Sequence, residues 1–437
     1  PSSQYQHRDH PHSYMYMRFT HVQSQDKQTG QREREREKER VTTMSSEGGS
    51  GGGCPFFSAE AGGSSGMSPA SVVGSKHRRE VTYREYINTD KLLSLQTGFD
   101  NVIHSHEEHL FIVVHEAFEL WFKQIIWDMQ SILDMFSSEE TLSSKNALLV
   151  GSRLRRMSLI LRSSLANFEI LETMHPCEFH EFRDFIGPAS GFQSHQMRVL
   201  ETMLGLKDKQ RFLCGKSSYM SVFDEDQKEV LLKLKKTKSL AEVLEDFLQK
   251  MDVPASFVEN FLKKKEEGLV DQKILWFGEE KRDDIEKAAK SEMEKVKSLL
   301  EGCDIGQPEV NLVVHLQKQE DGSAEPELGP EEVEEAKQRR CRARVAALFL
   351  HSYRDEPSIR PFSEICDLCV AFEQAFLLWR HRHARMVEVM IGRRVGTGGS
   401  AGVEYLDATC APRVFVDLWQ VRTMLMKNST LEPLDSL

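Results

Sequence analysis

The sequence has no long uninterrupted apolar run. No stretch of about 18 apolar residues occurs in the chain, so a membrane-spanning helix is not expected. An excess of positive charge is also missing, because 57 Lys and Arg residues stand against 68 Asp and Glu residues, for a formal net charge of -11. This balance argues against a general nucleic-acid binder. Neither a membrane nor a nucleic acid is therefore an expected partner.

Cysteines are few and show no paired framework. The 8 cysteines are scattered along the chain, which suits a reducing cytosol. One Cys-x-x-Cys pair, Cys366 and Cys369, lies in the helical pattern "PFSEICDLCVAFEQAFLLW". A zinc site would need a second pair, and none follows, so two buried helix cysteines are expected. The start of the chain lacks the apolar core of a secretory signal, and we expect a cytoplasmic location.

The two ends of the chain differ in composition. The first 80 residues hold "QREREREKER" and "AGGSSGMSPASVVGS", which are alternating charges followed by Gly/Ser-rich sequence. Such sequence buries too little apolar area to offset chain entropy, so residues 1–80 are predicted to be a disordered low-complexity extension. Residues 81–437 are predicted to form one all-helical domain, with a polar helical or loop excursion over about 268–330.

Helical periodicity dominates the chain after the extension, and convincing alternating strands are absent. The sequence therefore predicts an all-α fold. The expected helices cover residues 107–137, 143–173, 190–205, 225–250, 255–266, 281–302, 330–354, 359–392 and 413–427. Two long connections, "MHPCEFHEFRDFIGPASGFQS" and "GRRVGTGGSAG", mix charge with glycine in the manner of functional loops.

The second connection raises the question of a phosphate site. Gly396, Gly398 and Ala401 have the spacing of a dinucleotide-binding fingerprint. Such a fingerprint follows a buried strand and opens a helix, whereas the run "LWRHRHARMVEVMIG" before this loop has helical periodicity. A helix end with a flexible exit is therefore favoured over a phosphate-binding loop.

Two helices each place one histidine on a strongly apolar face. His115 shares a stripe with Phe111 and Phe118, and His383 shares one with Trp379, whereas His381 is rotated about 200° away. A single histidine of this kind is usually a satisfied core residue. Two of them on separate apolar helices, without zinc-type partners nearby, indicate a flat apolar cofactor with a neutral imidazole as axial ligand.

Two further groups of residues leave alternatives open. The cluster "HSHEEH" could bind a metal, but its spacing does not match HExxH, and a solvated helix entry is favoured. Arg183 lies in an aromatic segment with Gly and Pro, where a guanidinium can bind a carboxylate through two parallel hydrogen bonds. A surface ion pair with Glu178 or Asp184 accounts for its composition equally well.

These residues resemble the tryptophan 2,3-dioxygenase family. The resemblance rests on "YREYINTDKLL", "EEHLFIVVHEAFELWFKQIIWDM", "FRDFIGPASGFQSHQMRVLE", "LFLHSYRDEP" and "LWRHRHARMVEVMIGRRVGTGGSAGVEYL", which follow in family order over about residues 83–425. The resemblance implies an all-helical enzyme that contains haem b, ferrous in its active form. It also implies that the glycine loop closes over an amino acid rather than a nucleotide.

The family's functional residues transfer one at a time. His383, which lies 14 residues before the Thr of GTGG, matches the proximal haem ligand, and His115 matches the distal histidine near the indole N–H. Arg183 matches the arginine that binds the substrate carboxylate, with Phe179 beside it. Thr397 matches the loop threonine at the ammonium and carboxylate end of the substrate.

The remaining transfers concern the pocket wall and the oligomer. Phe111 matches the pocket phenylalanine before the distal histidine. Tyr83 and Tyr86 resemble the paired tyrosines that reach the pocket of a neighbouring subunit, which implies a homotetramer. The implied reaction inserts O2 across the indole C2–C3 bond of L-tryptophan to give N-formylkynurenine, the first step of tryptophan degradation by the kynurenine route.

Some positions depart from the family pattern. Glu116 replaces the usual Gln after the distal histidine, the loop has GGSAG where GGSSG is common, and Glu404-Tyr405 replaces a Tyr-Asp or Tyr-His step. A carboxylate next to His115 could favour imidazolium, although helix geometry turns it about 100° away.

Two other functions stay open at this point. A related histidine-ligated haem monooxygenase would hydroxylate an aromatic amino acid or an indole derivative. A non-enzymatic haem sensor or scaffold would bind haem without consuming O2 in the presence of tryptophan.

Overall fold

The computed structural model describes residues 80–98, 101–138, 142–211, 219–301 and 329–436. All of these residues belong to one unit that runs from Ser75 to Leu437. Nearly all of the extension expected over 1–80, and residues 302–328 of the expected excursion, lie outside them. The described part of the chain contains helices and turns without a strand, so the predicted all-α class is confirmed.

The elements follow one another along the chain without any repeat of a supersecondary unit. The α-helices are α2 (Tyr83–Tyr86), α3 (Thr89–Leu92), α4 (His106–Ser138), α5 (Ser144–Ser163), α6 (Leu165–Leu171), α7 (Pro176–Ile186), α8 (His195–Leu204), α9 (Glu225–Leu234), α10 (Leu240–Gln249), α11 (Phe257–Phe277), α12 (Arg282–Leu300), α13 (Pro330–Ser352), α14 (Arg360–Ile391), α15 (Val403–Ala408) and α16 (Val416–Met424). Short 3-10 turns, among them η3 (Gly191–Gln193), link several of these helices.

The long periodic segments form helices close to their expected bounds, as α4, α12, α13 and α14 illustrate. Two expected helices are split. The segment 225–250 becomes α9 and α10 because the Ser239 hydroxyl accepts from the backbone N–H of Glu242, whose carboxylate accepts from the N–H of Ser239. This capping box starts a new helix. The segment 143–173 breaks after Ser163, and the expected helix 255–266 continues to Phe277 in α11.

One expected connection is wrong. The stretch "MHPCEFHEFRDFI" was predicted to be a loop, but it contains the helix α7. His175 caps its N-terminus, Pro176 occupies the first turn, and the carboxylate of Glu178 accepts from the backbone N–H of His175. Proline with its fixed φ is favourable at this position, so the Pro that suggested a loop in fact begins a helix.

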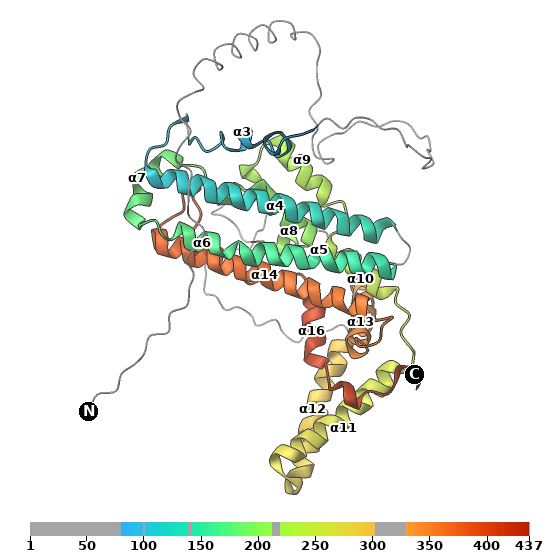
Figure 1. Ribbon diagram of the computed structural model, residues 1–437. Helices are drawn as coiled ribbons and strands as arrows, with labels where there is room; N and C mark the ends of the chain where they lie inside the picture. Colours follow the sequence, from blue (N-terminus) through green and yellow to red (C-terminus); the bar gives the residue numbers. More distant parts are fainter. Residues whose placement is uncertain (1–79, 99–100, 139–141, 212–218, 302–328, 437) are drawn as a thin grey trace, which may run out of the picture. The chain divides into compact units, whose positions relative to one another are not determined.

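The core is built around the helices α4, α5 and α14, which lie side by side (Figure 1). α14 contributes a continuous buried face that includes Phe372, Cys366 and Cys369, each fully excluded from solvent. The cysteines are free thiols buried on a helix, as predicted. Burial raises the pKa of the Cys366 thiol to about 12, so this thiol remains protonated and packs as a small apolar group.

The helices α11 and α12 pack against each other as an antiparallel pair (Figure 1). They cover part of the segment that was expected to be a polar excursion, and α12 buries Ile285, Met293 and Leu299 along one face. Within the residues that the structure describes, no helix combines the length and the apolar character needed to cross a membrane.

Candidate active site

One cavity of about 960 Å³ brings most of the predicted site residues together. Its walls come from α4, α6, α7, α8 and α14, and from the glycine loop, residues 392–402, that joins α14 to α15. Six of the predicted residues line it: Phe111, His115, Phe179, Arg183, His383 and Thr397. Residues separated by almost three hundred positions in sequence therefore share one enclosed space.

The imidazole of His115 is held by its own helix. Its Nδ1 lies 2.7 Å from the carbonyl oxygen of Phe111, one turn earlier on α4. A carbonyl only accepts, so Nδ1 carries the proton and donates, which leaves Nε2 of the neutral ring as an acceptor. Burial lowers the pKa of His115 and outweighs the opposing effect of the Glu119 carboxylate. The ring of Phe111 packs against the imidazole, with centroids 4.0 Å apart.

His383 faces the cavity from α14, whereas His381 is exposed to solvent. The ring of His383 stacks on Phe168 at 5.7 Å and contacts Trp379 at 5.3 Å. Burial lowers the pKa of His383 to about 4, and the nearby His115 lowers it further. His383 makes no hydrogen bond with any residue that the structure describes. A neutral imidazole with free nitrogens in an aromatic surrounding has the properties of a metal ligand.

The same cavity contains two N–H groups without a partner. The Nε1 atom of Trp379 and the Nε atom of Arg198 are buried and make no hydrogen bond within the described part of the chain. Both residues line the cavity. Buried donors are usually satisfied, so their presence beside His383 suits a bound group that offers acceptors such as carboxylates. Aromatic walls and two free donors fit a flat apolar cofactor with acidic substituents, as haem is.

A buried charge cluster fixes the position of Arg198. Glu201 accepts from Arg198 at 3.0 Å and from Arg380 at 2.5 Å, and it also pairs with Arg211. These three guanidinium groups hold the pKa of the Glu201 carboxyl far below its usual range, in spite of its burial. The sequence analysis missed this cluster, because its members lie on three separate segments and share no motif.

Arg183 lies on α7, not in a loop as expected, and points toward the glycine loop. Its guanidinium donates from Nη2 to the carbonyl oxygen of Val395 at 2.6 Å. It makes no ion pair with Glu178 or Asp184 in the described structure, so the surface-pair interpretation is wrong. One guanidinium edge thus binds the loop, and the residue also lines the cavity.

The glycine loop is closed against the segment that follows α7. The Thr397 hydroxyl donates to the carbonyl oxygen of Ala189 at 2.6 Å. A Cβ atom on Gly398 would lie 2.7 Å from the Cβ of Ser190, closer than side chains approach. Gly399 adopts a φ of +78°, which other residues rarely adopt. Glycine is thus required here by close packing at one position and by backbone conformation at the next.

The two tyrosines of the expected subunit contact lie elsewhere. Tyr83 and Tyr86 are on α2, are 77% and 79% exposed, and do not line the cavity of their own chain. The histidines His104, His106 and His109 are exposed at the start of α4, as the solvated helix entry predicted.

The departure at Glu116 has a partner of its own. Its carboxylate accepts from the side-chain amide of Gln96 at 2.5 Å, and it does not contribute to the pKa of His115. The carboxylate that does affect His115 belongs to Glu119, which accepts from Gln196 at 2.8 Å. The i, i+4 spacing of His115 and Glu119 was a sequence signal for this proximity that the analysis did not use.

Comparisons with known proteins agree with this arrangement. The model of the family described as Tryptophan 2,3-dioxygenase matches residues 70–425. The chain is 33% identical over 376 residues to a tryptophan 2,3-dioxygenase of Sorangium cellulosum, covering 83% of this chain and 87% of that protein. It is 31% identical over 364 residues to tryptophan 2,3-dioxygenase A of Danio rerio, covering 81% and 84% of the two chains. The chain belongs to the tryptophan 2,3-dioxygenase family.

Proposed function

We propose that this protein inserts both atoms of O2 across the indole C2–C3 bond of L-tryptophan to give N-formylkynurenine. The single observation that carries the proposal is the convergence of His383, His115, Arg183 and Thr397 on one cavity. A metal ligand, a polar group for the indole and two donors for an amino-acid head are what this reaction requires. Membership of the family supports the same assignment.

The family implies a haem cofactor. We propose haem b with His383 as its axial ligand, with the N–H groups of Trp379 and Arg198 available to its carboxylates. When bound in its ferrous form, the haem supplies the iron that activates O2. The low pKa of His383 keeps its imidazole neutral at physiological pH, as ligation requires.

The substrate's amino-acid end is assigned to Arg183 and Thr397. A guanidinium binds a carboxylate through its planar pair of donors, and the threonine hydroxyl adds a shorter polar contact. Fixing this end positions the indole, and such positioning commonly accounts for several kcal/mol of the activation barrier. The closed glycine loop excludes water from the same end of the cavity.

The indole ring is assigned to the aromatic wall formed by Phe111 and Phe179, whose ring centroids lie 5.8 Å apart. The Nδ1 proton of His115 is used by the Phe111 carbonyl, so Nε2 is the atom that accepts from the indole N–H. His115 thereby orients the indole and can take up its proton at Nε2.

The test is a single-turnover experiment with haem-supplemented protein. The protein is reduced without oxygen and then mixed with aerated tryptophan, while the near-ultraviolet band of N-formylkynurenine is followed. Mass spectrometry of the product separates addition of two oxygen atoms from addition of one, which a monooxygenase would give. A product with one added oxygen, or no oxygen uptake by haem-loaded protein, would refute the proposal.

We also propose a homotetramer in which Tyr83 and Tyr86 complete the pocket of a neighbouring subunit. Their exposure and their absence from their own chain's cavity support this arrangement. A complementation assay tests it: one chain carries Tyr83→Ala and Tyr86→Ala, and the other carries His383→Ala. Co-expression should recover activity that neither chain has alone, whereas tyrosines acting within their own chain would give no recovery.

A further inference from the structure

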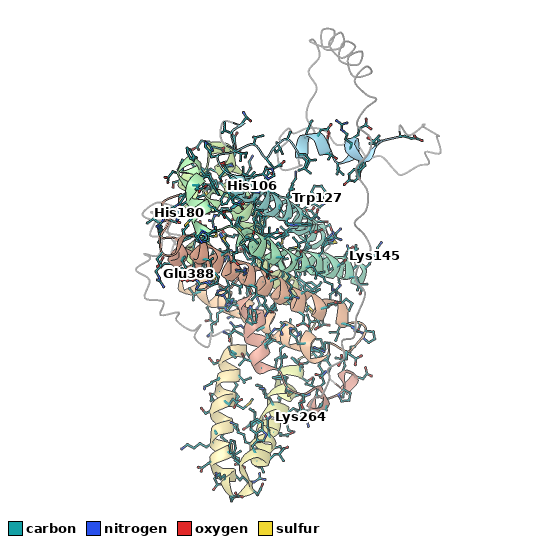
Figure 2. The ribbon with its side chains drawn as sticks, turned by 60° about the vertical axis from the view of Figure 1, so that its left-hand side comes forward. His106, Trp127, Lys145, His180, Lys264 and Glu388 are labelled. Atoms are coloured by element: carbon teal, nitrogen blue, oxygen red, sulfur yellow. The ribbon has the colours of Figure 1, made fainter. Side chains whose placement is uncertain are left out.

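The outer side of the glycine loop carries a polar contact that does not belong to the cavity. Nη1 of Arg394 lies 2.8 Å from Nε2 of His180, a residue of α7. Figure 2 shows His180 close to Glu388, near the C-terminal end of α14, from which the loop leaves. Neither Arg394 nor His180 lines the cavity, so neither can contact a ligand there.

The chemistry of this contact defines the state of His180. A guanidinium has only donors, so Nε2 accepts and the single ring proton lies on Nδ1. The charged groups that face the imidazole are Arg394 from the loop, and Arg183 and Asp184 from α7. Burial together with the two positive charges lowers the pKa of His180, and Asp184 opposes them more weakly. The neutral, accepting form is therefore the one present at neutral pH.

The contact adds to three others between the loop and the end of α7. Arg183 donates to the carbonyl of Val395, which directly follows Arg394 in sequence, and Thr397 donates to Ala189. Gly398 packs against Ser190. The loop is thus held at successive positions, and Arg394 holds the first of them from the solvent side.

We propose that Arg394 and His180 are positioning residues that hold the glycine loop against α7, and thereby place Arg183 and Thr397 for the amino-acid head of the substrate. The proposal rests on the function proposed above for these two cavity residues. It identifies a contact that selects for an intact amino-acid group without touching it.

This role predicts a specific kinetic signature. Loss of the contact should raise KM for tryptophan and leave kcat unchanged, because the loop contributes binding that is equal in the ground state and the transition state. Tryptamine lacks the carboxylate that the loop side of the pocket serves, so its KM should not change. A residue with a purely structural role would affect both substrates alike.

The first experiment compares two neighbouring arginines in the haem-loaded protein. Arg394→Gln should raise KM for tryptophan about three- to tenfold, the effect of one net hydrogen bond to a charged group that is partly exposed. Arg393→Gln removes the same charge from the same loop, but its partner is Glu404 at 3.0 Å, so KM should stay unchanged. Equal KM values in both variants and wild type would overturn the proposal, as would equal increases.

The second experiment uses His180 and pH. His180→Gln keeps an acceptor that does not titrate, so KM should equal that of wild type at neutral pH. In wild type, KM should rise as the pH falls through the lowered pKa of His180, because protonation replaces the acceptor with a donor that faces Arg394. The ratio of wild-type KM to His180→Gln KM should therefore increase toward acid pH. A ratio that stays constant with pH would contradict the proposal.

A third readout does not depend on turnover. Amide hydrogen exchange of residues 392–402 should be faster in Arg394→Gln than in wild type or Arg393→Gln, because the loop opens more often. If wild type forms no N-formylkynurenine, the proposed function fails, whereas unchanged exchange and unchanged KM in an active Arg394→Gln variant refute only the positioning role.

Discussion

Gly398 gives the most direct test of how closely the glycine loop must approach α7. In Gly398→Ala the new Cβ would lie 2.7 Å from the Cβ of Ser190 and 3.0 Å from its hydroxyl oxygen. Ordinary contacts begin at 3.4 Å, so the loop or the Ser190 segment has to move. The Cβ of Ser190 is attached to the backbone and cannot rotate away. The loop must therefore withdraw, and the 2.6 Å bond from Thr397 to Ala189 weakens with it.

The magnitude follows from the cost of overpacking. An extra methyl group in a closely packed contact typically costs about 1–3 kcal/mol. If the closed loop binds the substrate and the open loop does not, this cost reduces the affinity for tryptophan about five- to 150-fold. Isothermal titration with the haem-loaded enzyme measures the affinity, and KM for tryptophan provides a second measure.

Two further variants separate the clash from other effects. Gly399→Ala introduces strain at a φ of +78° but meets no atom within 4 Å, so its smaller effect reflects backbone conformation alone. Ser190→Gly removes the atom that Gly398→Ala would strike, so the double variant should regain affinity relative to Gly398→Ala. Wild-type affinity in Gly398→Ala, or a loss that Ser190→Gly does not relieve, would refute the reasoning.

Three other predictions concern the rest of the site. Arg183→Lys keeps the charge but loses the planar pair of donors, so KM for tryptophan should rise about 10- to 100-fold while KM for tryptamine stays constant; equal changes for both would contradict the assigned role. His383→Ala should retain its helical circular dichroism but lose the haem absorbance of wild type at equal protein concentration, and an unchanged spectrum would exclude His383 as ligand. Glu201→Gln leaves three buried arginines without their shared carboxylate and should destabilise the fold by about 3–5 kcal/mol at neutral pH. Because the pKa of Glu201 is depressed on folding, its stabilisation is present above the usual carboxyl value of about 4.3 and is lost as the pH falls through the lower folded value. Thermal melting from neutral to acid pH should therefore show a smaller decrease in Glu201→Gln than in wild type.

The parts of the fold that could be predicted from sequence are those with long periodicity. α4 and α14 carry apolar stripes over many turns, and their bounds agree with the prediction within about two residues. α7 was missed because its eleven residues alternate charged and aromatic side chains and begin with a proline. Its helix depends on the His175 cap and on packing against α4 and α14, which sequence periodicity does not report.

The candidate site divides in the same way. His383 and His115 were accessible from the sequence, because a polar residue on an apolar stripe is visible within one helix. The resemblance to the family supplied Arg183 and Thr397, whose composition alone left a surface ion pair equally plausible. The Glu201 cluster could not be predicted, because its four members come from separate segments that meet only after α8 packs near α14.

The contact between Arg394 and His180 shows why long-range polar pairs escape sequence analysis even when each partner lies beside a known motif. His180 directly follows Phe179, and Arg394 is three residues before Thr397, so both stand next to residues that the family resemblance identifies. Yet they are separated by more than two hundred positions, and nothing in either segment selects the other as a partner. The pairing follows from the fold, since α7 and the end of α14 are packed together and the glycine loop must turn back across them. A substitution at either position would therefore be read from sequence as a change of one exposed charge, whereas the structure predicts a change in substrate affinity.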